Sequence, residues 1–190
     1  MQCNGYPLLI KSKILPLTGR ILLFIIIPTL LFSQSDKLRI EQISIKDGLS
    51  QGSVRCIMED NLGFIWFGTH DGLNRYDGYN FKIYKNKLSD PTSISDNWIY
   101  CFQQNSKGDI WVGTADGLNL YLRGEDRFIQ IQSLKNNETK LEINAVYTIF
   151  INKEDNEEIV YFSTNKGLVK FNHNKNQFKV LYPKALGNPS

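Results

Sequence analysis

A repeat of about 45 residues is the feature that most constrains the fold of this chain. The segment FIWFGTHDGLNRY at residues 64–76 returns as DIWVGTADGLNLY at 109–121 and, with more changes, as IVYFSTNKGLVKF at 159–171. The first two segments start 45 residues apart, and the last two start 50 residues apart. A fixed period of this length is typical of stacked supersecondary units, and units this rich in β-forming residues predict propeller blades.

Each copy contains four short runs of β-forming residues with turn signals between them. In the first copy the runs are 54–58, 64–69, 73–76 and 81–84, and glycine, aspartate and asparagine separate them. Four such strands in succession make one antiparallel blade. We therefore predict an all-β fold, an incomplete β-propeller of about three four-stranded antiparallel blades after an N-terminal signal segment.

The residues that the copies share are assigned to blade structure rather than to chemistry. The large aromatic residue of the second strand is expected to pack between blades. The glycine in the turn after this strand is expected to supply the positive φ of a tight hairpin. The structural repeat residues are Trp66, Gly68, Gly72, Trp111, Gly113, Gly117, Tyr161 and Gly167.

The repeat also divides the chain into segments. Residues 39–45 are predicted to be a strand like the outer strands of the blades, and in closed propellers such an early strand often completes the last blade. Three blades are fewer than the four to eight of a closed ring, so we expect a fragment of a longer protein or a truncated product. The predicted segments are a signal peptide at 1–33, a lead-in strand and loop at 34–51, blades at 52–86, 87–133 and 134–183, and the start of a linker to a next blade at 184–190.

The N-terminal segment has the pattern of an export signal. Lys11, Lys13 and Arg20 precede an apolar run over residues 21–32, and small polar residues follow it at 33–35. The apolar run is shorter than the roughly 20 residues that span a bilayer, so a cleaved signal is favoured over a retained membrane anchor.

Net charge gives no support to a nucleic-acid partner. Three of the 22 basic residues and none of the 19 acidic residues lie in the signal segment, so the remainder of the chain is formally neutral. Nucleic-acid binding needs a clustered basic surface. We expect no nucleic-acid contacts in this chain.

The cysteines are predicted to be structural. Cys56 and Cys101 lie 45 residues apart and so take the same place in two successive copies, where the third copy has Thr148. Equivalent positions on neighbouring blades are expected to lie beyond the roughly 7 Å between Cα atoms that a disulfide tolerates. A small buried residue accounts for all three positions better than a bridge or a metal site does.

The candidate ligand site follows from propeller geometry. The loops that lead into the first strands and the loops between the second and third strands open on one face, and residues that vary there are free of packing rules. Trp98 stands where the other copies have Ser53 and Ala145, so it either stacks on a sugar ring or fills the gap between blades. The weaker candidate ligand-binding residues are His70, Asn97, Tyr100, Asn144 and Lys166.

No residue is assigned to catalysis, to a metal or to a cofactor. Asp71 and Asp116 each precede a turn glycine and are expected to face solvent. His70 and His173 lack the spacing to partners that a metal site requires.

Several motifs resemble a known family. GLS at residues 48–50, IWFGT at 65–69 and GLNRYD at 72–77 are similar to the two-component regulator propeller repeat. The second copy matches nearly as well through IWVGT at 110–114. The third departs from the pattern at Tyr161, at Ser163 and in a longer acidic turn predicted over residues 154–158.

The resemblance implies a function in signalling. In that family the repeats build the periplasmic sensor region of hybrid sensor histidine kinases, which are anchored in the inner membrane, and many members detect oligosaccharides. It implies an N-terminal fragment of an extracytoplasmic ligand-sensing propeller, which senses an oligosaccharide or another small periplasmic ligand. The signal would pass to a kinase that this chain lacks, so the chain itself is not expected to be an enzyme. The implied partners are further blades of the parent protein and a second copy in a homodimer.

Two alternatives remain open at this stage. One is a secreted propeller scaffold that binds protein, and the other is a polysaccharide hydrolase or lyase.

Overall fold

The computed structural model describes residues 40–135 and 139–183. The chain divides into two units, residues 1–41 and 42–190. Only the last two residues of the first unit are described, so the predicted signal peptide lies outside the described residues, as does the predicted linker near the C-terminus.

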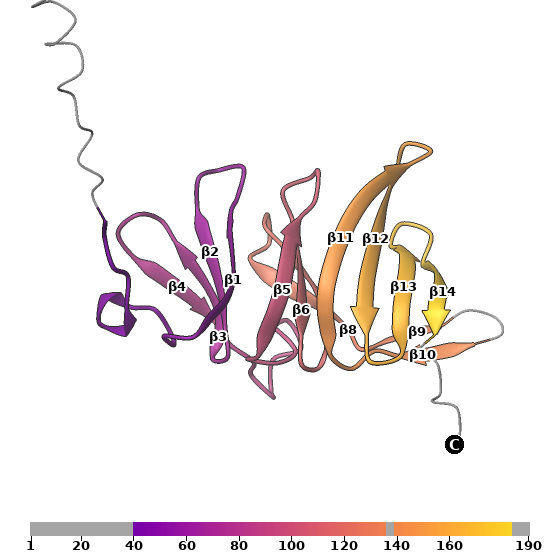
Figure 1. Ribbon diagram of the computed structural model, residues 1–190, viewed down its shortest axis with the longest axis horizontal. Helices are drawn as coiled ribbons and strands as arrows, with labels where there is room; N and C mark the ends of the chain where they lie inside the picture. Colours follow the sequence, from indigo (N-terminus) through magenta and orange to yellow (C-terminus); the bar gives the residue numbers. More distant parts are fainter. Residues whose placement is uncertain (1–39, 136–138, 184–190) are drawn as a thin grey trace, which may run out of the picture. The chain divides into compact units, whose positions relative to one another are not determined.

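The second unit contains three four-stranded antiparallel sheets that follow one another along the chain (Figure 1). Within each sheet the strands pair in sequence order, so each sheet is a simple meander. These sheets confirm the predicted all-β fold with four-stranded blades. The elements are η1 (Ile45–Asp47), β1 (Val54–Glu59), β2 (Ile65–Thr69), β3 (Gly72–Tyr76), β4 (Phe81–Tyr84), β5 (Ile99–Gln104), β6 (Ile110–Thr114), β7 (Gly117–Leu122), β8 (Arg127–Ile131), β9 (Ser133–Lys135), β10 (Lys140–Glu142), β11 (Val146–Glu154), β12 (Glu157–Thr164), β13 (Gly167–Asn172) and β14 (Gln177–Pro183).

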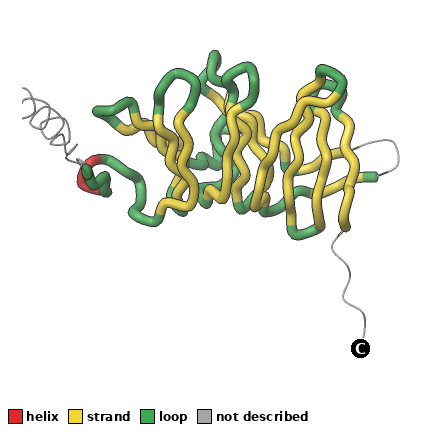
Figure 2. Tube along the Cα trace, turned by 45° about the horizontal axis from the view of Figure 1, so that its top comes forward, coloured by secondary structure: helices red, strands yellow, loops and turns green. Residues whose placement is uncertain are grey.

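The first strand of each sheet contacts the first strand of the next sheet. We call β1, β5 and β11 the inner strands, and Figure 1 shows them in chain order beside one another. Apart from the three-residue turn η1, the regular structure of the described residues is strand, as Figure 2 shows in yellow.

Two hydrophobic clusters join the sheets. The cluster between the first and second sheets includes Trp66, and the cluster between the second and third includes Trp111. Both indoles are fully buried. Side chains of this size contribute most of the buried apolar area in such a contact, and that area is the main stabilising term between blades.

A buried carboxylate fixes the first interblade contact. Oδ2 of Asp60 accepts a hydrogen bond of 2.7 Å from Nε1 of Trp66 and one of 2.6 Å from Nη2 of Arg123, which lies in the turn after β7 of the second blade. Burial raises the pKa of Asp60. Hydrogen bonds from these two side chains and from the backbone N–H groups of Leu62 and Phe64 together outweigh that effect and hold the pKa below its usual value. The ionised carboxylate therefore ties the first turn to the neighbouring blade.

Two hydrogen bonds between a serine and an asparagine account for the serine of the GLS motif. The backbone N–H of Ser50 donates to Oδ1 of Asn74 over 2.9 Å, and Nδ2 of Asn74 donates back to Oγ of Ser50 over 2.8 Å. Ser95 and Asn119 repeat both bonds in the second blade at 3.0 and 2.9 Å. The segment before each of these inner strands is thus bonded to the third strand of its own sheet.

Glycine in the second strand permits the close approach of the next blade. A Cβ at Gly113 would lie 2.6 Å from the carbonyl oxygen of Val146 and 2.6 Å from Sγ of Cys101. The third sheet has Ser163 at this place, where its Oγ lies 2.7 Å from Oγ1 of Thr148. Thr148 and Ser163 of the third copy therefore contact each other and replace the cysteine–glycine pair of the other copies.

The turn glycines have the backbone conformation that only glycine adopts readily. Gly72, Gly117 and Gly167 have φ of 113°, 106° and 128°. Each opens the third strand of its sheet. Their shared role is a backbone requirement of the turn.

The predicted strand at 39–45 does not form in its described part. Residues 40–44 have no regular structure, and Ile45 starts the turn η1. Ser44 and Asp47 form a capping box that holds this turn. A strand needs a hydrogen-bonded neighbour, and none of the described strands pairs with this segment.

The third sheet differs from prediction at its first hairpin. A longer acidic turn was expected over residues 154–158, but Glu154 pairs with Glu157 across two strands, so the turn has two residues. Asp155 and Asn156 both have positive φ, of 48° and 64°, as a tight hairpin turn requires.

A small hairpin of β9 and β10 joins the second and third sheets, and the sequence did not predict it. Its Leu134 is buried in the cluster around Trp111.

No helix among residues 40–135 and 139–183 is long and apolar enough to span a membrane.

Candidate ligand-binding face

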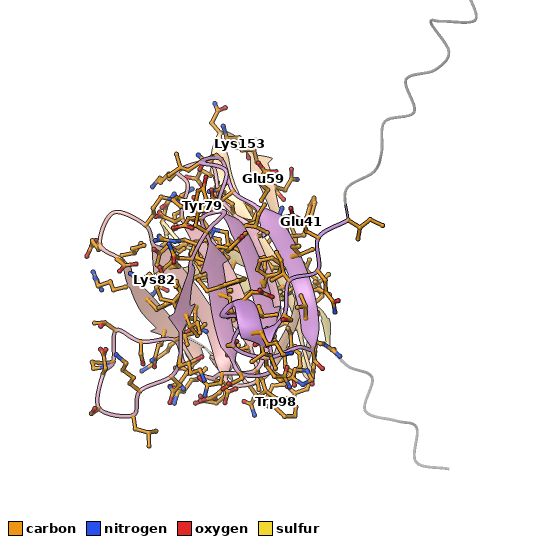
Figure 3. All side chains as sticks on the ribbon, turned by 90° about the vertical axis from the view of Figure 1, so that its left-hand side faces the viewer. Glu41, Glu59, Tyr79, Lys82, Trp98 and Lys153 are labelled. Atoms are coloured by element: carbon orange, nitrogen blue, oxygen red, sulfur yellow. The ribbon has the colours of Figure 1, made fainter. Side chains whose placement is uncertain are left out.

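Loops from different blades meet at one end of the sheets. The turns between the second and third strands, at residues 70–71 and 115–116, lie beside the segments that lead into the next inner strands. Figure 3 shows Trp98 at this end, whereas Glu59 and Lys153 lie at the opposite end.

Backbone hydrogen bonds between blades hold these loops. The N–H of Gly72 donates to the carbonyl of Asn97 over 2.8 Å, and the N–H of Gly117 donates to the carbonyl of Asn144 over 2.7 Å. Within the second blade, the N–H of Ala115 donates to the carbonyl of Trp98 over 3.1 Å. The segments before β5 and β11 are therefore fixed on the blade that each contacts.

His70 and Trp98 form a stacked pair on this end. Their ring centroids are 4.6 Å apart and their planes differ by 13°, although the residues belong to the first and second blades. Trp98 keeps 49% of its surface exposed. One face of the indole covers His70, which contributes to the contact between the two blades, and about half of Trp98 remains exposed to solvent.

The other candidate residues have more local roles. Oδ1 of Asn97 accepts a hydrogen bond of 2.7 Å from the N–H of Asn86, so its side chain orders a loop. Nζ of Lys166 donates to the carbonyl of Glu142 over 3.1 Å. Asn144 is exposed, and its carbonyl holds the turn at Gly117.

Tyr100 belongs to a group that the sequence reasoning missed. Each inner strand has a β-bulge at the same place, and the bulged residues are Arg55, Tyr100 and Tyr147. The guanidinium of Arg55 lies 6.0 Å from the centroid of the Tyr100 ring, and that centroid is 5.4 Å from the centroid of Tyr147. We call these three residues the inner-strand ladder. The sequence contained one signal for this group, because the three residues occupy matching positions in successive copies of the repeat.

The cysteines are partly buried and free. Cys56 and Cys101 form no disulfide. Burial raises the pKa of both thiols to about 12. A group with so small a thiolate population is a poor nucleophile and metal ligand.

The carboxylates of this face are engaged with neighbours. Asp71 pairs with Lys85 at 2.8 Å, and Asp116 accepts a hydrogen bond of 2.6 Å from Gln132. No group of three or more histidine, cysteine or acidic side chains in the described part of the chain is arranged to hold a metal ion.

One hollow lies on the third sheet, away from this face. It has a volume of about 420 Å³, and its lining includes Glu154, Glu157, Lys170 and Lys175. Lys170 pairs with Glu154, and Lys175 pairs with Glu157 at 2.8 Å. These charges neutralise one another, so the hollow offers little to a ligand.

The repeated sheets, bulges and interblade glycines define the class of the fold as a segment of a β-propeller. Residues 48–71 and 93–116 match the family model described as "Two component regulator propeller". The chain therefore carries two copies of the two-component regulator propeller repeat, which confirms the resemblance noted from the sequence.

Known proteins with similar segments belong to signalling systems by name. The chain is 44% identical over 75 residues to "Histidine kinase P4" of Formosa agariphila. These 75 residues cover 40% of this chain and 6% of the kinase. The extracellular domain of BT3049 from B. thetaiotaomicron, named as a hybrid two component system, aligns with a TM-score of 0.67 and 28% identity. That alignment covers 77% of this chain and 20% of the BT3049 chain.

A second solved structure supports the fold alone. The extracellular domain of BT4673 from B. thetaiotaomicron aligns with a TM-score of 0.57 and 23% identity, over 72% of this chain and 19% of that chain. The present chain thus spans about one fifth of the solved chains that it matches.

Proposed function

We propose that this chain is part of the extracytoplasmic, periplasmic ligand-sensing propeller of a hybrid two-component regulator, and that its ligand is an oligosaccharide. The propeller repeat and the alignment with an extracellular domain of such a system support the sensor role. The parent protein would carry the membrane anchor and the kinase that receives the signal.

The His70–Trp98 pair is the observation that carries the ligand assignment. The scaffold tolerates small residues at the position of Trp98, as Ser53 and Ala145 show, yet an indole stands there half exposed. Hydrogen-bonded backbone on both sides holds it in place. A rigid, partly exposed aromatic surface beside polar loops is suited to stacking on the apolar face of a sugar ring.

Signalling would then follow from a shift between two arrangements of paired sensors. A ligand that binds one arrangement more tightly moves the equilibrium toward it by its difference in binding free energy. A homodimer of the parent protein would convert this shift into a movement of its membrane segments.

Calorimetric titration of the ectodomain encoded by the complete gene, with a panel of oligosaccharides, tests the proposal. We expect at least one oligosaccharide to bind, and Trp98→Ala to weaken binding about tenfold or more. Tyr79→Ala is the matched control, because Tyr79 is 88% exposed and lies away from Trp98 (Figure 3). Failure of every oligosaccharide, or an equal effect of the two substitutions, would contradict the proposal.

An enzyme that cleaves polysaccharide has less support. The two turn carboxylates that could serve as a pair are bound to Lys85 and Gln132. A protein-binding scaffold would use the blade faces, and it remains the alternative if no sugar binds.

A further inference from the structure

The inner-strand ladder is a second exposed surface, and its residues project from bulges. Arg55, Tyr100 and Tyr147 have no register partner on the adjacent strand, whereas the residues on either side of each are paired. A bulge turns its side chain out of the regular alternation, and bulges often occur where a protein directs a side chain toward a site.

Blade packing does not require the two tyrosine side chains of the ladder. Val146, beside Tyr147, is completely buried, whereas Tyr147 itself is 47% exposed. In the second blade Ile99 is likewise buried and Tyr100 is half buried. The buried neighbours supply the contact between blades, so the bulge residues are free to differ.

The charge of Arg55 is unmatched. Among residues 40–135 and 139–183, no carboxylate forms an ion pair with Arg55. Arg123 and Arg127, in contrast, pair with Asp60 and Glu125. An exposed guanidinium held over a tyrosine ring keeps its fork of N–H donors free for a planar anion.

We propose that the inner-strand ladder binds an acidic oligosaccharide, with a sugar carboxylate on Arg55 and sugar rings against Tyr100 and Tyr147. This inference rests on the proposed function and narrows its ligand to a uronate-containing chain. Arginine binds a carboxylate through two parallel N–H···O bonds, which a neutral sugar cannot accept with equal strength. The tyrosines belong to successive blades and lie side by side, so they would contact successive parts of one chain.

The test compares two probes on the ectodomain encoded by the complete gene: an oligogalacturonate and a neutral galactan oligosaccharide of equal length. We expect the oligogalacturonate to bind about tenfold more tightly at low salt, and the difference to shrink as salt screens the charge. Arg55→Gln should lower the affinity for the oligogalacturonate about tenfold and so remove this preference. Arg127→Gln is the matched control, since Arg127 lies on the outer strand β8.

A preference for the neutral probe, or an oligogalacturonate affinity that Arg55→Gln leaves unchanged, would overturn the ladder assignment. If Trp98→Ala still weakened binding of the neutral probe in that case, the proposed sensing of oligosaccharides would stand without the ladder. If no oligosaccharide of either kind bound, both proposals would fall. Tyr147→Ala is a second test of the ladder. It should weaken the binding of both probes, and an unchanged affinity for both would also contradict the ladder assignment.

Discussion

Nε1 of Trp66 donates a hydrogen bond of 2.7 Å to Oδ2 of Asp60, and the second blade lacks the equivalent bond. Its tryptophan, Trp111, has a buried Nε1 with no hydrogen-bond partner. Asn105 takes the place of Asp60, and its Oδ1 accepts the N–H groups of Lys107 and Asp109. The remaining amide nitrogen is a donor, so it cannot satisfy the indole.

Asn105→Asp should therefore stabilise the chain. A carboxylate would keep the two bonds to the loop and offer its second oxygen to Trp111. A buried donor without a partner costs about 1 to 3 kcal/mol, so we expect the free energy of unfolding to rise by about 1 kcal/mol in urea denaturation. An unchanged or lower value would show that the indole does not need this acceptor.

Asp60→Asn is the reverse substitution and should destabilise the chain. It places an amide donor beside the indole of Trp66 and removes the negative charge that faces Arg123. We expect the free energy of unfolding to fall by about 2 to 3 kcal/mol at neutral pH. An effect no larger than that of an exposed substitution would contradict the role given to this carboxylate.

The contribution of Asp60 should also disappear in acid. Its pKa is lower in the folded chain than the ordinary value of 3.8, so its ionisation favours the folded state above that value. The stability is lost as the pH falls from about 4 through the folded pKa. Urea midpoints measured from pH 7 downward should show the difference between the wild type and Asp60→Asn shrinking below pH 4, whereas a constant difference would exclude this linkage.

Gly113→Ala tests the close approach of the second and third blades. The added Cβ would meet the carbonyl oxygen of Val146 at 2.6 Å, and backbone cannot move aside cheaply. We expect the free energy of unfolding to fall by about 2 to 4 kcal/mol. Gly124→Ala is the control, because a Cβ there has no atom within 4 Å, and it should change stability by less than about 0.5 kcal/mol. Equal effects would show that the blades are not packed this closely.

The partly buried cysteines should resist alkylation until the chain unfolds. With a pKa of about 12, Cys56 and Cys101 have a thiolate fraction of about one in ten thousand at pH 8. In a Cys3→Ser variant, iodoacetamide labelling followed by mass spectrometry should be slow in buffer and rapid in urea. Fast labelling of the folded chain would place these thiols at the surface.

Much of the fold could be predicted because the repeat encodes it locally. Gly72 and Gly117 mark the turn, and the tryptophan six residues before each marks the buried strand, so a match between copies predicts a match in structure. The predicted longer turn over residues 154–158 was wrong, because comparison with the shorter copies suggested that the extra residues form a loop. They instead lengthen the two strands on either side of Asp155 and Asn156. The intrinsic preference of these two residues for positive φ was the better guide.

The candidate site was only partly predictable because it depends on relations between blades. The variable position of Trp98 could be read from the repeat, but its stacking on His70 joins residues of different sheets. The ladder depends on bulges at Arg55, Tyr100 and Tyr147, and a bulge is a property of the register between two strands. Single runs of sequence do not specify that register.

The most direct test of the account is ¹⁹F NMR of the chain labelled with 5-fluorotryptophan, because the chain has three tryptophans and two of them are buried between blades. The resonance that is missing from the spectrum of Trp98→Phe is assigned to the exposed tryptophan. We predict that adding an oligosaccharide that binds the ectodomain shifts the Trp98 resonance and leaves those of Trp66 and Trp111 in place. A bound sugar that leaves the Trp98 resonance unmoved, or that shifts only the two buried residues, would contradict a ligand site on this face.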